Sequence, residues 1–405
     1  MRHVVVMVAT SYPRFPGDGV GSFMEPIAKG VAALGHEVHL VAPWHPAITR
    51  SRPEDGVHFH FFRYAPGRSL AVFGYAGGLR EDTRLKRAAW AVAPAAIAAG
   101  WFKAWRVATK KRATVMHGHW VVPGGVIAAA AAGRRPLVVS LHGSDVFVAE
   151  HNAVVRTAAR AVFGRAAWTT ACSDDLRRRA VALGAAEART EVVPYGVDTS
   201  RFTPDPGIRA TVRAELGLGD APMVFSAGRL VSKKGFEYLI QAAPRLAASR
   251  PDLRVVIAGD GDLRRDLARR ADEIGPDRVL LLGNQPQSQI ARLAAAADVV
   301  AVPSVRDDAG NVDGLPNFAL ESMATATPLV ATSAGGLGQL IEDGVTGRLV
   351  GERDATALAE AIDGLLADPE RARRIGVAAR RHVDTEFSWA RTAGRLAAAY
   401  DRAAR

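Results

Sequence analysis

The chain has 405 residues, of which 48% are hydrophobic and 23% charged, a composition that excludes a disordered protein. Its length predicts two domains of ~100–200 residues each. Cys172 is the only cysteine, which excludes an internal disulfide and a cysteine-based zinc site and predicts a reducing, cytoplasmic location. The apolar stretch 88–102 contains Pro94 and is shorter than the ~20 residues that span a bilayer, so no transmembrane helix is expected.

Positive charge is concentrated in the first half of the chain. Residues 1–195 hold 25 Lys and Arg against 13 Asp and Glu, whereas residues 196–405 hold 27 against 28. Ala- and Arg-rich coding could explain the total of +11 but not this asymmetry. The asymmetry indicates an anionic partner, such as a phosphate-bearing ligand, an anionic lipid surface or nucleic acid. Nucleic acid is not expected, because the sequence contains no recognition helix, zinc knuckle or RNA-binding aromatic signature.

Short β-branched runs alternate with Ala- and Leu-rich segments through residues 1–195, which predicts βα units and a parallel sheet. The run VVVMVAT near the start fits a buried strand better than a signal peptide. A helix is predicted over 22–34, ending at Gly35. Strands are predicted over 4–9, 37–42, 113–117, 137–141, 167–171 and 191–193.

Segment 194–206, PYGVDTSRFTPDP, is rich in proline and turn residues and predicts a linker. The same alternation then restarts, and residues 372–405 are predicted to be helical. Strands are predicted over 224–227, 254–258, 279–282, 299–302, 329–331 and 348–350. The predicted fold class is therefore α/β, with two doubly wound, Rossmann-like domains that face a cleft and bind ligand beyond the carboxyl ends of their strands.

Glycine- and histidine-containing loops follow strands of the first half. Segment 17–22, GDGVGS, resembles a phosphate-cradling loop but has neither a G-x-G-x-x-G fingerprint nor a P-loop. His117 and His119, in HGHW, fall on one side of an extended segment, and LHGSD at 141–145 follows the next strand. No third ligand has metal-site spacing, so we expect one histidine to orient a substrate hydroxyl and the other to be packed. Ser144 lacks a nucleophile elbow, which argues against a catalytic triad.

Two groups of residues in the second half predict a site for a nucleotide sugar. Arg229 and Lys234, in GRLVSKKG, follow the strand 224–227, where such cations would stabilise a leaving diphosphate. Asp313 and Glu321 flank a Gly-Leu-Pro turn and a helix start. Free amides at a helix start bind phosphate, and the two carboxylates could accept hydrogen bonds from sugar hydroxyls. A solvated basic loop and an ordinary surface helix are the alternatives.

Taken in chain order, these motifs resemble the retaining GT-B glycosyltransferases of family 4, the group 1 glycosyl transferases. The likeness runs nearly from end to end. It is carried by the loop 19–22, GHEVHLVAP at 35–43, HGHW, LHGSD, VPYGVDTSRFTP at 193–204, GRLVSKKG, VVIAGDGDL at 255–263, DVVAVPS at 298–304, DGLPNFALESMA at 313–324 and DGVTGRLV at 343–350. The resemblance implies an acceptor-binding domain over 1–195, a nucleotide-sugar-binding domain over 196–382, and a terminal helix over 383–405 that crosses back to the first domain.

The resemblance also implies roles for individual residues. Arg229 and Lys234 match the diphosphate-binding pair. Asp313 matches the acid that binds the donor sugar, Glu321 the acid that binds the ribose, and His119 the active-site histidine near the transferred sugar. The other donor-side positions are Gly19, Gly21, Gly283, Asn284, Gln285, Gly314, Leu315, Asn317, Phe318 and Ala319. His142 and Asp145 are expected on the acceptor side.

The sequence departs from the family pattern at three places. Asp313 stands where many members have Glu, which shortens the reach to the sugar by one methylene. Thr325-Ala326 replaces a common Cys-Gly, which we interpret as a change in packing. Gln339 stands where Glu is frequent, so a charge near the cleft is missing.

The implied reaction moves a hexosyl or N-acetylhexosaminyl group from a UDP- or GDP-sugar to a hydroxyl of a lipid-linked saccharide, a glycolipid or a small natural product. Configuration would be retained, the leaving diphosphate would take the acceptor proton, and neither a metal nor another cofactor is expected. A sugar-nucleotide epimerase of the same architecture is the alternative. Segment 80–112 places cations beside Trp and Phe, which predicts either peripheral contact with an anionic membrane or a pair of helices with a solvated basic face.

Overall fold

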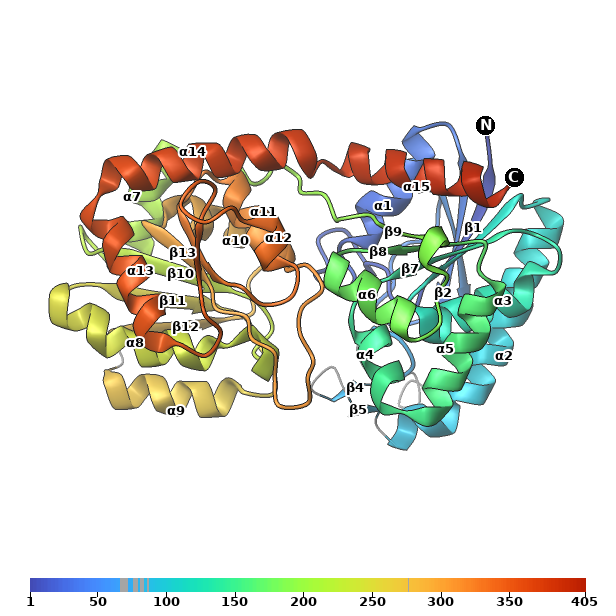
Figure 1. Ribbon diagram of the computed structural model, residues 1–405, viewed down its shortest axis with the longest axis horizontal. Helices are drawn as coiled ribbons and strands as arrows, with labels where there is room; N and C mark the ends of the chain where they lie inside the picture. The colour runs from blue at the N-terminus through green and yellow to red at the C-terminus, as the bar shows by residue number, and fades with distance from the viewer. Residues whose placement is uncertain (66–71, 76–78, 81–83, 86, 276) are drawn as a thin grey trace. The chain divides into compact units, whose positions relative to one another are not determined.

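The computed structural model describes residues 1–405 except 66–71, 76–78, 81–83, 86 and 276. The chain forms two compact units, Met1–Tyr195 with Trp389–Arg405, and Gly196–Ser388. Each unit is built on its own parallel sheet flanked by helices (Figure 1). Residues 383–388 belong to the second unit, and the chain rejoins the first unit at Trp389.

The first unit contains a seven-stranded parallel sheet in the order β3-β2-β1-β6-β7-β8-β9. Its strands are β1 (Val4–Val8), β2 (Glu37–Pro43), β3 (Val57–Phe62), β6 (Val115–His119), β7 (Leu137–Leu141), β8 (Trp168–Ala171) and β9 (Thr190–Val192). Its α-helices are α1 (Met24–Ala33), α2 (Arg87–Lys110), α3 (Val126–Ala132), α4 (Ser144–His151), α5 (Ala153–Arg165), α6 (Asp174–Ala182) and α15 (Trp389–Ala403). The strand order reverses between β1 and β6, the position at which doubly wound sheets bind ligands.

Helix α15 belongs to this unit because one of its faces is buried there. The buried residues are spaced three or four apart, which places them on one stripe of the helix, and they are Thr392, Ala393, Leu396, Ala399 and Tyr400. Gly30 of α1 allows a close approach, since a Cβ atom there would lie 2.9 Å from the Cβ of Ala393.

The second unit contains a six-stranded parallel sheet in the order β12-β11-β10-β13-β14-β15. Its strands are β10 (Met223–Ala227), β11 (Arg254–Ala258), β12 (Val279–Gly283), β13 (Val299–Val302), β14 (Leu329–Thr332) and β15 (Arg348–Val350). Its α-helices are α7 (Pro206–Glu215), α8 (Phe236–Ser249), α9 (Arg264–Ile274), α10 (Gln287–Ala296), α11 (Asn317–Ala324), α12 (Leu337–Leu340), α13 (Ala355–Ala367) and α14 (Pro369–Glu386). Here the order reverses between β10 and β13, so ligand-binding groups are expected after these two strands.

The structure confirms the α/β class and corrects several predicted elements. Strand β3 was not predicted, because VHFHFF at the sheet edge is only half-buried and lacks a continuous aliphatic run. Strand β6 extends to His119 instead of ending at His117, so both histidines lie within the sheet. The predicted helix over 22–34 begins at Met24, and Gly35 ends it with a φ of 88°.

Segment 80–112 is not a pair of helices. Its described residues form one 24-residue helix, α2, with Pro94 inside, preceded by the short antiparallel strands β4 (Leu79–Arg80) and β5 (Arg84–Leu85). Lys86, one of the cations of this segment, lies outside the described residues. Within the described part of the chain, no helix is long and apolar enough to cross a bilayer.

Candidate functional site

The loop after β10 is fixed at both ends by neighbouring strands. The amide of Gly228 donates to the carbonyl of Ala258 at 3.0 Å, and the amide of Leu230 donates to that of Asp260 at 3.0 Å. At the other end Gly235 has a φ of 63°, and a Cβ atom there would lie only 1.9 Å from the carbonyl oxygen of Pro303. Glycine is therefore required at 235, and the loop is held against the end of β13.

Two lysines and one aspartate form the charged centre of the second unit. Lys234 Nζ lies 2.6 Å from Asp313 Oδ2, and Lys233 Nζ lies 3.2 Å from Asp313 Oδ1. Burial raises the pKa of Asp313, but the two ammonium groups outweigh burial and hold the pKa at about 2. Asp313 is therefore ionised at neutral pH. Its carboxylate is ion-paired with Lys234, the lysine that was predicted to bind a diphosphate.

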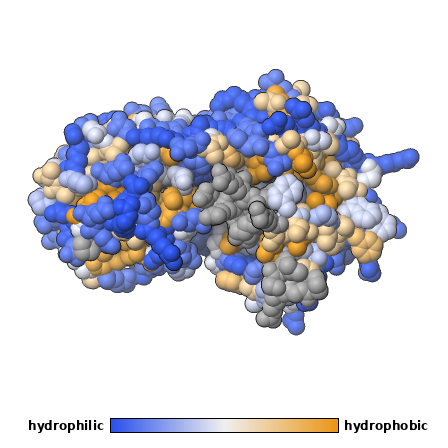
Figure 2. All heavy atoms as spheres, turned by 90° about the horizontal axis from the view of Figure 1, so that it is seen from below, coloured by the Kyte–Doolittle hydropathy of each residue, from blue (hydrophilic) through white to orange (hydrophobic). Residues whose placement is uncertain are grey.

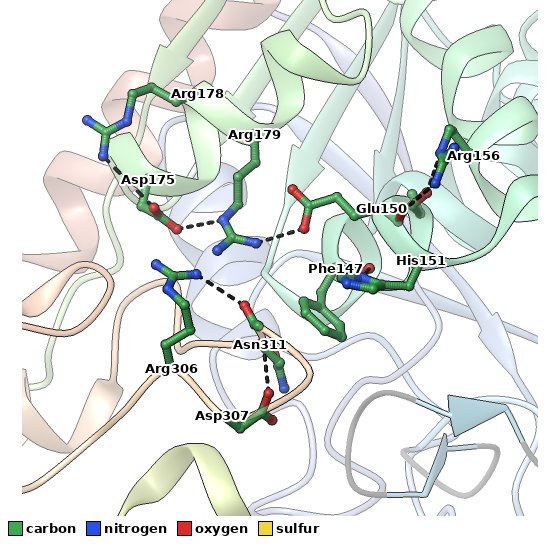
Figure 3. Close-up of polar contacts among 12 residues, drawn as sticks. Phe147, Glu150, His151, Arg156, Asp175, Arg178, Arg179, Arg306, Asp307 and Asn311 are labelled. Atoms are coloured by element: carbon green, nitrogen blue, oxygen red, sulfur yellow. Dashed lines mark hydrogen bonds and ion pairs between the residues drawn. The ribbon is translucent and has the colours of Figure 1, made fainter. Parts of the chain in front are cut away.

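A close backbone contact fixes Asp313 in position. Gly335, which follows β14, has a φ of 55°, and a Cβ atom there would lie 2.1 Å from the carbonyl oxygen of Asp313. Earlier in the same loop, the side chain of Asp307 accepts hydrogen bonds from the amides of Ala309 at 3.0 Å and Asn311 at 2.8 Å. Figure 3 shows Asp307 and Asn311 facing each other across this turn. The turn thus sets the path of the chain into Asp313.

Helix α11 carries the second predicted acid, Glu321. Burial raises the pKa of Glu321 to about 7, although Lys234 and Arg201 act in the opposite direction. Lys234 therefore lowers the pKa of both Asp313 and Glu321, although it is ion-paired with Asp313. The four predicted residues Arg229, Lys234, Asp313 and Glu321 all belong to the second unit, after β10 and β13, and the Arg229 side chain is exposed.

The start of α11 forms the floor beside these acids. Gly314 and Leu315 are buried, and Phe318 packs edge-on against Phe225 of β10 with ring centroids 5.6 Å apart. The amide of Ala319 donates to the carbonyl of Pro316 at 3.1 Å. The amides of Asn317 and Phe318 precede this bond, as expected for groups at the open end of a helix.

The segment predicted to meet the base lies at the end of β12. The carbonyl of Gly283 accepts a hydrogen bond from the amide of Gly259 at 2.7 Å, and Gln285 Nε2 donates to the carbonyl of Leu282 at 2.9 Å. The Asn284 side chain is exposed. These backbone groups lie on the same edge of the sheet as the loops that follow β10 and β13, because all strands are parallel.

In the first unit, the histidines of β6 lie in the interior. His117 and His119 are fully buried, with ring centroids 4.0 Å apart. His117 is hydrogen-bonded on both ring nitrogens, to Tyr400 Oη and Ser140 Oγ, each at 2.8 Å. His119 Nδ1 lies 3.1 Å from His142 Nε2, whereas its Nε2 has no hydrogen-bond partner among the described residues. His117 is therefore satisfied on both ring nitrogens, whereas the equally buried His119 keeps one nitrogen without a partner among the described residues.

Asp145 is buried, and its carboxylate holds the backbone of the loops around these histidines. It accepts hydrogen bonds from the amides of Val121 at 2.7 Å, His142 at 3.2 Å and Gly143 at 3.0 Å. Trp120 next to His119 has a φ of 63°, a conformation that costs energy for a bulky residue and is often retained at functional sites. Asp145 thus binds backbone amides of these loops. Of the two residues predicted for the acceptor side, His142 and Asp145, it is His142 that contacts His119.

The glycine loop after β1 is organised by Asp18. Its carboxylate accepts hydrogen bonds from the Arg14 amide at 3.0 Å and guanidinium Nε at 2.6 Å, and from the amide of Val20 at 3.2 Å. Gly21, with a φ of 68°, packs against Ser11, whereas a Cβ atom at Gly19 would meet nothing within 4 Å. The side of the loop at Gly19 is therefore open enough for a ligand to approach the backbone.

Three features of these sites were missed or misinterpreted from the sequence. Lys233 was not assigned a role, yet it is buried and paired with Asp313. Ala326 was interpreted as a packing change, but it adopts a φ of 56°, so the usual glycine would relieve backbone strain there. Arg179 of α6 binds Glu150 of α4 at 2.7 Å and Asp175 at 2.9 Å, which ties these two helices together (Figure 3).

A parallel sheet that presents cations and carboxylates at its switch point is typical of nucleotide-binding domains. Comparison with known proteins defines the class further. The family "Glycosyl transferases group 1" matches residues 209–382, and "Glycosyltransferase Family 4" matches residues 17–201. The chain is 38% identical over 268 residues to a GDP-mannose-dependent α-(1-6)-phosphatidylinositol monomannoside mannosyltransferase of Mycolicibacterium smegmatis, covering 66% of this chain and 70% of that protein.

Other relatives agree with this assignment. A D-inositol 3-phosphate glycosyltransferase of Nocardia farcinica is 38% identical over 240 residues, which cover 57% of this chain and 51% of that protein. The crystal structure of Anabaena Alr3699/HepE in complex with UDP-glucose has the same fold, with a TM-score of 0.77 at 22% identity, over 98% of this chain and 99% of that one. The chain belongs to the group 1 glycosyl transferases of family 4 and is a GT-B glycosyltransferase.

Proposed function

We propose that this enzyme is a retaining mannosyltransferase that moves mannose from GDP-mannose to a hydroxyl of a phosphoinositol-containing glycolipid. The observation that carries the proposal is the grouping of Lys233, Lys234, Asp313 and Glu321 after β10 and β13, where a diphosphate and its two sugars would bind. GDP-mannose is the donor named for relatives from Mycolicibacterium smegmatis and Mycobacterium tuberculosis. The acceptors in the relatives' names, phosphatidylinositol monomannoside and inositol 3-phosphate, both carry phosphorylated inositol.

In the proposed reaction, the acceptor hydroxyl attacks the anomeric carbon from the side on which the diphosphate leaves. The new glycosidic bond forms as the bond to the diphosphate breaks, and the leaving phosphate oxygen takes the hydroxyl proton. Arg229 and Lys234 would stabilise the charge that develops on the diphosphate. Because these cations fill the role of a divalent ion, catalysis is expected to need no metal. Asp313, ionised and paired, suits hydrogen bonding to sugar hydroxyls better than proton transfer.

The acceptor is proposed to bind the first unit, which carries the excess positive charge of the chain. Exposed aromatic residues on α2 support contact with a lipid surface. Trp101 follows Trp90 by 11 residues, about three helical turns, and Trp105 follows Trp101 by 4 residues, about one turn, so the three indoles lie on one side of the helix. Hydrophobic side chains gather on the face of this unit seen in Figure 2. A groove of about 470 Å³ beside α2 is lined by Trp44, Phe61, Phe62, Arg63, Ala99, Phe102 and Lys103.

A transfer assay tests the donor and the acceptor together. Radiolabelled GDP-mannose, UDP-glucose and UDP-N-acetylglucosamine are each incubated with phosphatidylinositol monomannoside or inositol 3-phosphate, with and without EDTA. We expect label to move from GDP-mannose to the glycolipid, with EDTA having no effect and an α-linked product by NMR. Transfer only from a UDP-sugar would refute the donor assignment. An epimerised nucleotide sugar formed without acceptor would favour the epimerase alternative.

Co-sedimentation with vesicles tests the membrane contact separately. The enzyme should sediment with phosphatidylinositol-containing vesicles at low salt and be released at high salt, because screening weakens surface attraction. Replacing Trp101 and Trp105 by Ala should reduce sedimentation, whereas Val154→Ala should not, since Val154 is an exposed apolar residue on α5. Equal sedimentation of all variants, or none at low salt, would rule out this surface.

A further inference from the structure

The first unit contains two hydrogen bonds between a tyrosine and a histidine, His142–Tyr195 and His117–Tyr400. The first of them leads to His119. His142 Nδ1 is 2.7 Å from Tyr195 Oη, and His142 Nε2 is 3.1 Å from His119 Nδ1. Tyr195, His142 and His119 therefore form a continuous chain that ends at His119 Nε2, for which the described part of the protein offers no hydrogen-bond partner. The rings are held by packing, because Phe23 stacks against Tyr195 at 4.9 Å and contacts His142 at 4.8 Å between ring centroids.

The chemistry of this chain decides which nitrogen of His119 carries the proton. A neutral imidazole has one donor and one acceptor nitrogen. A phenol hydroxyl is a stronger donor than an imidazole N–H, and an imidazole nitrogen is a stronger acceptor than a phenol oxygen. Tyr195 therefore donates to His142 Nδ1, His142 donates from Nε2 to His119 Nδ1, and the remaining proton of His119 lies on its free Nε2.

Burial keeps the two histidines of this chain neutral. It lowers the pKa of His142 to about 3 and the pKa of His119 well below the ordinary value, and the neighbouring imidazoles reinforce this direction. A neutral His119 that already accepts at Nδ1 cannot remove a proton through Nε2. Its Nε2, which has no partner within the residues that the structure describes, can only donate a hydrogen bond, and a fully buried donor left in that state costs ~1–3 kcal/mol until a ligand or water accepts from it.

We propose that Tyr195 and His142 are positioning residues that fix His119 as a neutral Nε2–H donor toward an oxygen of the transferred sugar. The tautomer assignment follows from the hydrogen bonds alone, and only the identification of the acceptor as a sugar oxygen rests on the proposed function. His119 then orients the sugar and takes no part in proton transfer. Tyr195→Phe keeps the ring that stacks on Phe23 but removes the hydroxyl that sets the direction of the chain.

The second tyrosine–histidine pair provides a matched control. Tyr400 Oη lies 2.8 Å from His117 Nδ1, and His117 Nε2 lies 2.8 Å from Ser140 Oγ, so this chain does not include His119. Tyr400→Phe loses the same kind of hydrogen bond at a fully buried position. The fall in Tm of Tyr400→Phe measures the cost of removing a buried tyrosine hydroxyl that has no effect on the His119 tautomer. The fall in Tm of Tyr195→Phe is compared with this value.

The test is NMR of the full chain with ¹⁵N-labelled histidine, in which long-range correlations identify the protonated nitrogen of each ring. His119 is assigned by the signal that disappears in His119→Gln. We expect the proton of His119 on Nε2 in the native enzyme and in Tyr400→Phe, and a shift toward Nδ1 in Tyr195→Phe. In transfer assays, Tyr195→Phe should lower kcat roughly 3- to 10-fold, the effect of one hydrogen bond, with the KM for donor nearly unchanged.

Two results would overturn the proposal. One is a native His119 that carries its proton on Nδ1, and the other is a Tyr195→Phe spectrum in which the His119 signals stay as in the native enzyme. Because the spectra need neither donor nor acceptor, a wrong assignment of GDP-mannose would leave this test intact. Failure of the transfer assay with an unchanged native tautomer would instead count against the proposed function.

Discussion

The ion-paired Asp313 predicts an uncommon combination of effects for Asp313→Asn: lower stability, preserved nucleotide binding and lost transfer. Lys234 and Lys233 hold the pKa of Asp313 at about 2, against an ordinary value of 3.8. At about 1.36 kcal/mol per pKa unit, the pair stabilises the native state by roughly 2–3 kcal/mol at neutral pH. Because the pKa is lowered on folding, this stabilisation is present above about pH 4 and is lost as the pH falls through about 2.

In Asp313→Asn this stabilisation should disappear at neutral pH. For a unit of this size, the loss corresponds to a fall in Tm of about 4–12 °C, measured by calorimetry. GDP should bind at least as tightly as to the native enzyme, since the diphosphate no longer competes with a carboxylate for Lys234. Transfer should fall at least ~10-fold, because the sugar loses a charged hydrogen-bond acceptor.

Asp308→Asn is the control for this experiment. Asp308 lies in the same loop and pairs with Arg353 at 2.8 Å, but its side chain is 95% exposed, so its removal should change neither Tm nor GDP binding. A Tm for Asp313→Asn equal to that of the native enzyme, or a loss of GDP binding in this variant, would refute the reasoning.

Three further predictions concern the second unit. The pKa of Glu321 is raised to about 7 from 4.5, so the stability that depends on its protonation is present below about pH 4.5 and is lost as the pH rises through 7. In Glu321→Gln, the free energy of unfolding measured with denaturant should therefore vary less between pH 5 and 8. An unchanged dependence of this free energy on pH would contradict the assignment. Ala326→Gly should stabilise the protein by up to ~1 kcal/mol by relieving its left-handed backbone, and a lower midpoint in urea would contradict this. Gly235→Ala should destabilise the protein severely and abolish GDP binding. The control is Gly364→Ala in helix α13, where an added Cβ atom would meet no described atom within 4 Å, and this variant should raise the Tm. Similar melting of the two variants would refute the close contact at Gly235.

The central strands were predictable because their residues are buried on both faces and form continuous aliphatic runs. Strands β7, β11 and β13 have the predicted bounds. The edge strand β3 was not predictable from the sequence. Its alternating His and Phe reflect a half-exposed position, which only the folded sheet defines. The helical extent of α2 was also hidden, because Pro94 suggests a break where the chain continues through it.

The site was predictable where it depends on residues close in sequence. Arg229 and Lys234 follow one strand, and Asp313 and Glu321 flank one turn, so strand ends and spacing were enough to group them. The pairing of Lys233 with the same carboxylate depends on the short 3₁₀ turn over Ser232–Lys234, which spacing does not reveal.

The hydrogen bonds of the histidines could not be derived from local sequence at all. Tyr195 lies 53 residues after His142, and Tyr400 lies 283 residues after His117. Their approach depends on the place of β9 in the first sheet and on the packing of α15 in the same unit, which are properties of the complete unit.

The central claim is that the lysine–carboxylate cluster of the second unit binds the donor nucleotide, and calorimetric titration of GDP tests it most directly. Lys234→Met should weaken GDP binding at least ~10-fold, because a charge-assisted contact to the diphosphate is lost. Lys29→Met, which removes an ammonium paired with Glu25 and Asp55 in the first unit, should bind GDP like the native enzyme. Equal GDP affinity of the native enzyme and Lys234→Met would contradict the account.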